Sequence, residues 1–239
     1  MEYYYLLEWD SLFFGYKIAC IKPFKLELLK LNDIIGELRD KDFKLAYCFV
    51  NLKDKTSNDS LNQVSGLLID EKITYSIYLS EETSYPIPGN VIPYDLKYAS
   101  KKLKSLTLQS GAYSRFNIDP NFKDNEFEKL YHEWIEKSVS RILADEILVY
   151  DENQEITGFV TLKINKNIGS IGLIAVEEKQ RGKSIGKKLI NAALMYFKEK
   201  KIKNIEVVTQ KANYGACRFY ESCGFKVSQI VNVYHLWIK

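Results

Sequence analysis

The chain has few of the residues that carry metal and nucleophile chemistry in many enzymes. Among 239 residues there are two histidines, His132 and His235, and four cysteines, none of which forms a C-x-x-C pair. This spacing does not predict a zinc site, and any histidine base would have to be one of these two residues. We therefore predict no metal, and we expect the cysteines to be reduced and mostly buried thiols.

The sequence also lacks a strong excess of charge and a long apolar run. Its net charge is +3, from 34 Lys and Arg against 31 Asp and Glu, so no global field attracts nucleic acid or anionic lipid. The apolar run Ile171–Val176 is far shorter than the ~18 residues that span a bilayer, and the start Met1-Glu2-Tyr3 lacks the basic region of a signal peptide. With 46% hydrophobic residues the chain can form a core. We expect a cytoplasmic protein with no nucleic-acid or membrane partner.

Two segments of unusual composition suggest how the chain is divided. Asp54–Gln63 is polar at every position except Leu61 and is predicted to be a loop. Tyr85–Pro93 holds three of the five prolines, which favours an extended linker. We place a boundary near residue 95, between a smaller α/β domain of residues 1–95 and a larger domain of residues 96–239.

Apolar periodicity predicts helices and strands on both sides of this linker, and hence the α/β (α+β) fold class. Before the linker, we expect a helix within Phe24–Arg39 and strands at Tyr47–Leu52 and Ile73–Leu79. After it, the pattern predicts seven features in order: a helix within Phe122–Ala144, a hairpin of Ile147–Tyr150 and Ile156–Leu162, a strand at Ile168–Val176, a helix at Gly186–Lys200, a strand at Asn204–Val208, a helix at Tyr214–Ser222 and a terminal strand at Phe225–Ile238.

The turn between the strand Ile168–Val176 and the following helix predicts an anion site. Its residues Gln180–Gly186 include two glycines, a serine and two basic residues, and they open a helix whose backbone N–H groups lie at the positive end of the helix dipole. Lys187 and Lys188 add positive charge. The spacing is neither that of a Walker A loop nor that of a dinucleotide-binding G-x-G-x-x-G. A solvated basic helix start is the alternative reading.

A second group of residues follows the next strand. Tyr220 comes seven residues after Asn213, about two turns at 3.6 residues per turn, so both lie on one helix face. The combined order is strand-V-x-x-x-x-R-G-x-x-x-G-helix, then strand-T-x-x-x-N-x-x-A-x-x-x-Y-x-x-x-G-F. Over roughly residues 95–239 this order resembles the GNAT acetyltransferase superfamily. Ser184 is a departure, because the family usually has glycine there.

The resemblance implies a mixed sheet flanked by helices, with acetyl-CoA as the cosubstrate. In that family, backbone amides of the turn hold the pyrophosphate of coenzyme A, and two parallel strands splay to admit the acetyl-pantetheine arm. The implied cofactor-binding residues are Ile174, Ala175, Val176, Arg181, Gly182, Lys183, Ser184, Ile185, Gly186, Lys187 and Asn213. Tyr220 is the implied catalytic residue, a general acid for the leaving thiolate, and we nominate no general base.

A further resemblance concerns the acetyl acceptor. The segment Trp9–Gly15 is similar to the W-[DE]-x-x-F-F-G opening of the dTDP-fucosamine acetyltransferases, and Ser114–Phe116 followed by Tyr131–Glu136 is similar to a second part of that group. This implies a small-molecule acceptor, the 4-amino group of a dTDP-4-amino-4,6-dideoxyhexose. The resemblance also implies that the domain of residues 1–95 contributes to the acceptor site. The implied acceptor-site residues are Trp9, Phe13, Phe14, Arg115, Phe116 and Trp134. Alternatively, the aromatic residues fill the core and Arg115 forms a helix cap or a surface ion pair.

Two other classes of function stay open. One is a GNAT enzyme that acetylates a peptide, a protein or another small amine. The other is a non-catalytic acyl-CoA-binding module, which would be favoured if Tyr220 were buried and the cleft blocked. The sequence leaves open the identity of the hexose, the general base and the oligomeric state, with a homodimer among the options.

Overall fold

The computed structural model describes residues 3–22, 24–82, 85–86, 89–123 and 125–239. The chain forms two compact units: one comprises Met1–Ile73, Gln210–Ala212 and Gln229–Lys239, and the other Thr74–Thr209 and Asn213–Ser228. The compact units divide after Ile73, within β4 (Leu67–Tyr78), so this strand contributes residues to both units. The predicted linker includes residues 87–88, which lie outside the described residues. Its last three residues form strand β5, Val91–Pro93.

The first unit contains a sheet with the strand order β1-β2-β3-β10. Strand β2 is antiparallel to β1 and parallel to β3, and β10 is antiparallel to β3. The elements are β1 (Tyr4–Leu6), α1 (Glu8–Phe14), β2 (Lys17–Ile21), α2 (Leu28–Asp40), β3 (Phe43–Asn51), α3 (Lys55–Gln63) and β10 (Lys226–Trp237). The strand predicted at the C-terminus therefore belongs to the same sheet as the first strands of the chain.

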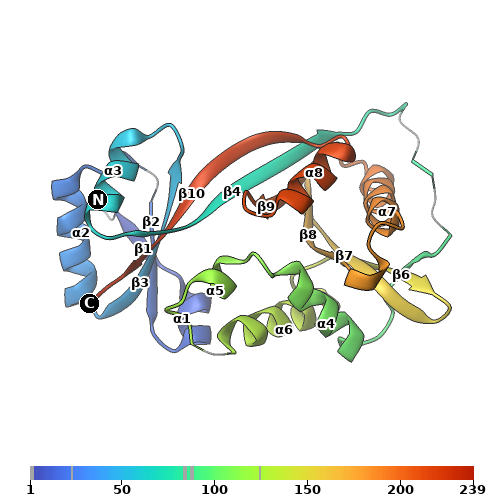
Figure 1. Ribbon diagram of the computed structural model, residues 1–239, viewed down its shortest axis with the longest axis horizontal. Coiled ribbons are helices and arrows are strands. Elements are labelled where there is room, and N and C mark those ends of the chain that lie inside the picture. The colour runs from blue at the N-terminus through green and yellow to red at the C-terminus, as the bar shows by residue number, and fades with distance from the viewer. Residues whose placement is uncertain (1–2, 23, 83–84, 87–88, 124) are drawn as a thin grey trace. The chain divides into compact units, whose positions relative to one another are not determined.

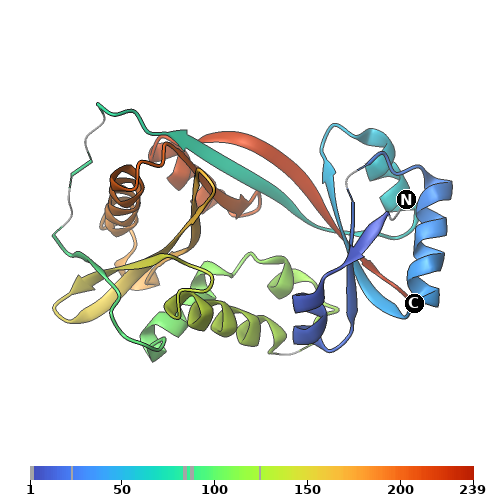
Figure 2. The same ribbon diagram turned by 180° about the vertical axis from the view of Figure 1, so that it is seen from behind.

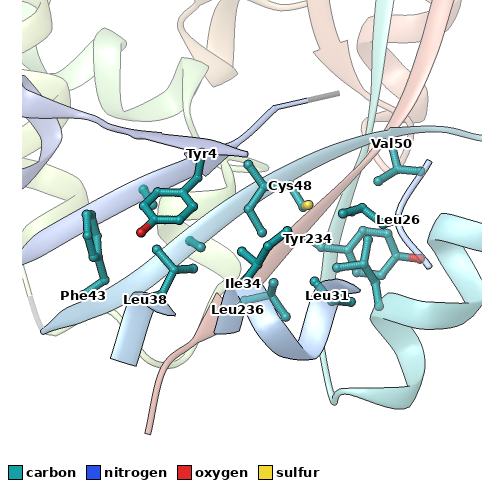
Figure 3. Close-up of a cluster of buried hydrophobic side chains, with 14 residues drawn as sticks. Tyr4, Leu26, Leu31, Ile34, Leu38, Phe43, Cys48, Val50, Tyr234 and Leu236 are labelled. Carbon is teal, nitrogen blue, oxygen red and sulfur yellow. The ribbon is translucent and has the colours of Figure 1, made fainter. Parts of the chain in front are cut away.

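The core of the first unit lies between α2 and the sheet. Leu31, Ile34 and Leu38 share one face of α2, as helical spacing requires, and all three are fully buried. They belong to one cluster with Cys48 of β3 and Tyr234 of β10 (Figure 3). The predicted helix within Phe24–Arg39 is confirmed, and the side chains of its apolar face form part of the core.

The polar segment Asp54–Gln63, predicted to be a loop, is helix α3 with Asp54 as its N-cap. The Asp54 carboxylate accepts a hydrogen bond from the backbone N–H of Ser57, at 3.1 Å. The Ser57 hydroxyl is buried and accepts a bond from the N–H of Leu26, at 2.8 Å. The prediction was wrong because the polar side chains serve as a cap and as buried hydrogen-bond partners.

The second unit contains a sheet with the strand order β4-β9-β8-β7-β6-β5 (Figure 1). After β5 come α4 (Lys101–Ser110), α5 (Arg115–Ile118), α6 (Glu126–Val139), β6 (Glu146–Glu152), β7 (Glu155–Asn165), β8 (Ile168–Val176), a short 3₁₀ turn (Glu178–Gln180), α7 (Ile185–Glu199), β9 (Asn204–Gln210) and α8 (Tyr214–Ser222). The expected mixed sheet flanked by helices is confirmed. The hairpin β6–β7 turns at Asn153 and Gln154, both with positive φ, as a tight two-residue hairpin requires.

The helices of the second unit cover both faces of its sheet (Figure 2). Phe159 of β7 is buried in a cluster with residues of α4 and α6. Gly158, its neighbour, points to the opposite face, where an added Cβ would lie 3.0 Å from Leu189 of α7. Helix α8 lies on the α7 face, since an added Cβ at Gly186 of α7 would meet Phe219 of α8. Among the described residues, no helix is both long and apolar enough to cross a membrane.

We predict that Leu31→Ala lowers the free energy of unfolding by about 2–5 kcal/mol, because it leaves a cavity in the core of the first unit. Leu31 is fully buried, whereas Leu29 on the same helix is 82% exposed. The matched control Leu29→Ala should change stability by less than about 0.5 kcal/mol. Urea unfolding followed by circular dichroism measures both, and equal losses would contradict this assignment of the α2 faces.

Candidate functional site

The two parallel strands β8 and β9 separate about halfway along their length. Their register runs from Ile168 opposite Asn204 to Ile171 opposite Val207. Beyond this point β8 continues to Val176 and β9 to Gln210. The described pairing therefore ends five residues before β8 does, and this is the splay that the sequence resemblance implies.

A bulge bends β8 at the start of the splay. The register between β7 and β8 shifts between Val160 and Leu162, so Gly172 and Leu173 both face Thr161. The Thr161 hydroxyl accepts a hydrogen bond from the N–H of Leu173, at 2.8 Å. A Cβ at Gly172 would lie 2.7 Å from the same oxygen, so a side chain there would clash. The bulge bends the strand and increases its local twist.

The last residues of β8 direct backbone groups toward the open side of the splay. The N–H of Glu177 donates to the carbonyl of Thr157 on β7, at 2.8 Å. Because hydrogen bonding alternates along an antiparallel ladder, the N–H groups of Val176 and Ile174 point away from β7 and toward the side of β9. These two donors can hold an acyl-amide chain or polarise a carbonyl between the strands.

The basic turn places a set of backbone N–H groups at the start of α7. Gly182 has φ +83° and Ser184 has φ 61°, both in the left-handed region. The N–H of Lys188 donates to the carbonyl of Ser184, at 3.0 Å. The N–H groups of Ile185, Gly186 and Lys187 precede this first helical bond, so they are the orphan donors of the helix N-terminus.

The left-handed backbone explains the residue types at the turn. Glycine adopts this conformation freely, whereas a residue with a Cβ pays roughly 1–2 kcal/mol. Ser184 adopts the same left-handed backbone conformation, with a free-energy penalty of this size. Gly186 has a different reason, because an added Cβ would lie 3.1 Å from the ring of Phe219. The glycine at 186 allows α7 and α8 to approach each other.

The charged side chains of the turn make contacts at the surface. Arg181 donates from Nε to the carbonyl of Val176 at 3.2 Å, and from Nη2 to Gln109 of α4 at 3.4 Å. Lys183 donates to Gln180, at 2.5 Å. Arg181, Lys183 and Lys187 are all exposed, so their charge is available to an anion at the helix start.

Helix α4 also contacts the end of β8 through an ion-pair group. Lys102 lies 2.6 Å from the carboxylate of Glu177 and 3.0 Å from that of Glu155. The hydrogen bond to Glu177, and then that to Glu155, raises the pKa of Lys102. Because Lys102 forms an ion pair with Glu177, the negative charge of Glu177 repels an anion at the turn less strongly.

Asn213 and Tyr220 occupy the two ends of α8. The Asn213 side-chain oxygen accepts a hydrogen bond from the N–H of Ala216 at 3.1 Å, so Asn213 is the N-cap of the helix. Tyr220 is only 4% exposed. Its ring centroid lies 5.8 Å from that of Tyr75 and 6.0 Å from that of Phe225.

The environment of Tyr220 disfavours the charged form of its hydroxyl. Burial raises the pKa of Tyr220 well above its usual range, and the thiols of Cys223 and Cys217 add to the rise. A tyrosine that stays protonated at neutral pH is in the form that a general acid requires. Burial of Tyr220 is also one of the two features that would favour a non-catalytic acyl-CoA-binding module, the other being a blocked cleft.

The predicted acceptor-site residues form two separate groups, one in each unit. In the first unit, Trp9 and Phe13 stack at 5.3 Å, and Phe13 meets Phe14 edge-on at 4.9 Å. Phe14 is buried, whereas Trp9 is 36% exposed. Phe14 therefore packs in the core, and Trp9 is partly exposed at the surface.

In the second unit, α5 and α6 bring together the other three acceptor-site residues. The Arg115 guanidinium lies over the ring of Phe116, 4.5 Å from its centroid. Phe116 is buried, and its ring centroid is 5.9 Å from that of Trp134. Burial raises the pKa of Tyr131, while Ser114 and Arg115 partly counteract that rise. Arg115 thus sits beside an aromatic cluster.

The two histidines are not in the turn or the splay. His132 is half-buried on α6. His235 is fully buried in β10, with its ring 4.8 Å from that of Tyr47. In the part of the chain that the structure describes, no group of three or more His, Cys, Asp or Glu side chains could hold a metal ion.

Sequence reasoning missed several residues that shape this site. Tyr75 lies beneath α8, Thr161 supports the bulge, and Lys102 and Gln109 reach the turn from α4. The alternation in the predicted strand Ile73–Leu79 places Tyr75 on one face of that strand. It does not say which helix covers that face, because the partner is about 145 residues further along the chain.

A comparison with protein families places these features in a known class. Residues 112–225 match the model of the Acetyltransferase (GNAT) family. This range contains the splayed strands, the turn and both ends of α8. The segment is therefore similar to GNAT acetyltransferases, as the sequence motifs indicated.

Comparisons over longer stretches agree with this class. A GCN5-related N-acetyltransferase from Sphaerobacter thermophilus has the same fold over 99% of this chain and 76% of its own, at a TM-score of 0.64 and 13% identity. An uncharacterized N-acetyltransferase of Methanocaldococcus jannaschii is 28% identical over 117 residues, which is 46% of this chain and 50% of that protein. The spore coat polysaccharide biosynthesis protein SpsD of Bacillus subtilis is 26% identical over 132 residues, 55% of this chain and 45% of SpsD. The chain spans about half the length of these two curated relatives.

We predict that Gly186→Val lowers the free energy of unfolding by about 1–3 kcal/mol, because the added methyl groups would overlap the ring of Phe219. The matched control is Gly36→Val in α2, where an added Cβ meets nothing within 4 Å. This control should change stability by less than about 0.5 kcal/mol. Chemical denaturation of both variants checks the prediction, and an unaltered stability of Gly186→Val would contradict the close approach of α7 and α8.

Proposed function

We propose that the protein is an acetyl-CoA-dependent N-acetyltransferase. The observation that carries this proposal is the parting of β8 and β9 after Ile171, directly before a helix start rich in free donors and positive charge. The match of residues 112–225 to the GNAT family supports it. The proposal includes a cytoplasmic location.

Two parts of the site fit acetyl-CoA. The N–H groups of Ile185–Lys187, with Arg181 and Lys183 beside them, would hold the pyrophosphate. The N–H groups of Ile174 and Val176 would hold the acetyl-pantetheine arm along β8, and Ala175 between them bonds toward β7. When bound, acetyl-CoA supplies an activated acetyl group. The chain's own task is to orient that group, polarise its carbonyl and provide a proton.

Tyr220 is the residue that we propose as the proton donor for the departing thiolate. Its hydroxyl is protonated at neutral pH, as that of a tyrosine ordinarily is, and α8, capped by Asn213, holds it on a rigid element. A sugar amine has a lower pKa than a lysine side chain, near 10.4, so water or a weak carboxylate can accept its proton. The proposal therefore needs no dedicated histidine base.

For the acceptor we propose the 4-amino group of a dTDP-4-amino-4,6-dideoxyhexose. The support is the similarity of Trp9–Gly15 and of the segments around Arg115 and Trp134 to dTDP-fucosamine acetyltransferases. SpsD, which is 26% identical over part of its length, is named for polysaccharide biosynthesis. Arg115, stacked on Phe116, has the planar fork that pairs with a phosphate group.

A non-catalytic acyl-CoA-binding module is the second candidate. One observation favours it, namely the 4% exposure of Tyr220, because a proton donor must reach its acceptor. An acetyltransferase would transfer the acetyl group to an acceptor, whereas a non-catalytic module would bind acetyl-CoA without turnover.

We predict that the full chain, incubated with acetyl-CoA and the dTDP-linked amino sugar, adds a single acetyl group to the sugar amine. Mass spectrometry of the sugar nucleotide detects the product, and free coenzyme A measures the rate. A lysine-containing peptide serves as the control acceptor and should not be turned over. Efficient acetylation of the peptide alone would assign the protein to another class of GNAT enzyme.

We predict that Tyr220→Phe lowers kcat by about 10²-fold or more, since general acid catalysis typically contributes ~10²–10⁴-fold. The variant keeps the ring and removes only the hydroxyl, so the affinity for acetyl-CoA and the melting temperature should change little. Steady-state kinetics and calorimetry measure the two effects. Binding of acetyl-CoA with no turnover by the wild-type chain would instead favour the non-catalytic module.

A further inference from the structure

Tyr75 is a nearly inaccessible tyrosine, only 1% exposed, that lies in β4 beneath α8. Its hydroxyl donates a hydrogen bond to the carboxylate of Glu221, at 2.9 Å. Its ring centroid lies 5.8 Å from that of Tyr220, at an interplanar angle of 43°. Tyr75 therefore contacts two consecutive residues of α8, one by its ring and one by its hydroxyl.

The strand that carries Tyr75 comes from outside the segment that matches the GNAT family. That match begins at residue 112, whereas β4 ends at Tyr78 and neighbours β9 in the sheet. The N–H of Leu79 donates to the carbonyl of Lys203, and the N–H of Lys211 donates to that of Glu71. These bonds define an antiparallel register, which places Tyr75 opposite Val207.

Val207 is also the last residue of β9 that pairs with β8. Tyr75 thus lies beside the point at which the two strands separate, on the face that α8 covers. Glu221 is exposed and Tyr75 is buried, so their bond joins the surface of α8 to the sheet below it. A single bond of this kind restricts the rotation of α8 about its axis, and with it the direction of the Tyr220 side chain.

We propose that Tyr75 is a positioning residue that acts through Glu221 and Tyr220: it holds the Tyr220 ring in the orientation needed to protonate the departing thiolate. This inference rests on the proposed function. The ring of Tyr75 limits the tilt of Tyr220, and its hydroxyl anchors the next residue of the helix. Cys217, one turn earlier on α8, is a second side chain at the Tyr75 hydroxyl.

The first test is a double-mutant cycle in the full chain. Tyr75→Phe should lower kcat by about tenfold, as small misplacements of reacting groups do, and leave the KM for acetyl-CoA unchanged. Because Tyr75 acts through the Tyr220 hydroxyl, adding Tyr75→Phe to Tyr220→Phe should cause no further loss. The matched control is Tyr78→Phe on the same strand, where the side chain is 64% exposed; it should behave as wild type.

Glu221 provides a test by conservative replacement. Glu221→Gln retains an oxygen that can accept the bond from Tyr75 and should keep most of the activity, whereas Glu221→Ala should resemble Tyr75→Phe. An active wild type together with wild-type kcat in Tyr75→Phe would overturn the inference and leave the proposed function intact. Multiplicative losses in the double variant would likewise overturn it, because they would show that Tyr75 acts independently of Tyr220.

A second readout does not depend on turnover. In protein labelled with 3-fluorotyrosine, the ¹⁹F resonance that disappears in Tyr220→Phe reports Tyr220. This resonance should shift in Tyr75→Phe and Glu221→Ala and stay in place in Tyr78→Phe. An unmoved resonance would refute the positioning role even if no acceptor were found, whereas a shifted resonance in a protein without acetyltransfer would refute the proposed function alone.

Discussion

The site depends on the separation of two parallel strands. Within a sheet, backbone N–H and C=O groups are satisfied by the neighbouring strand. When β8 leaves β9 after Ile171, the donors of Ile174 and Val176 lose that neighbour, and a ligand with amide or carbonyl groups can take its place. The bulge at Gly172 and the hydroxyl of Thr161 maintain the separation from the β7 side. The rest of the site is built around this opening.

Helices α7 and α8 bring the other groups to the opening, and their contact requires one small residue. Gly186 lets the first turn of α7 approach Phe219, so the orphan donors of α7 lie on the same face of the sheet as α8. Burial then determines the chemistry of Tyr220. Removing its hydroxyl from water raises the pKa, because the charged phenolate is disfavoured. Tyr220 is protonated at neutral pH, as tyrosines ordinarily are, and its burial disfavours loss of that proton still further.

The strand β4 joins the segment that matches the GNAT family to residues that precede it in sequence. Its segment Thr74–Tyr78 belongs to the second unit, and the rest of it to the first. A family segment that starts at residue 112 thus forms its sheet with a strand from upstream. Tyr75 shows that this strand brings a side chain against α8 as well as backbone hydrogen bonds.

Part of the fold follows from signals that are local in the sequence. The apolar spacing of α2, the hairpin β6–β7 and the helices α7 and α8 each depend on residues that are close together along the chain. The motifs of the turn and α8 likewise indicated a resemblance to acetyltransferases, which the match of residues 112–225 supports. Other features are visible only in the folded chain: the helix that follows Asp54, the division of the units at Ile73, and the contacts of Gly186 and Tyr75 with α8. Contacts between residues distant in sequence accompany them, such as the hydrogen bonds of Ser57 with Leu26 and of Tyr75 with Glu221. Periodicity shows which face of a strand is buried and does not encode which distant element covers it.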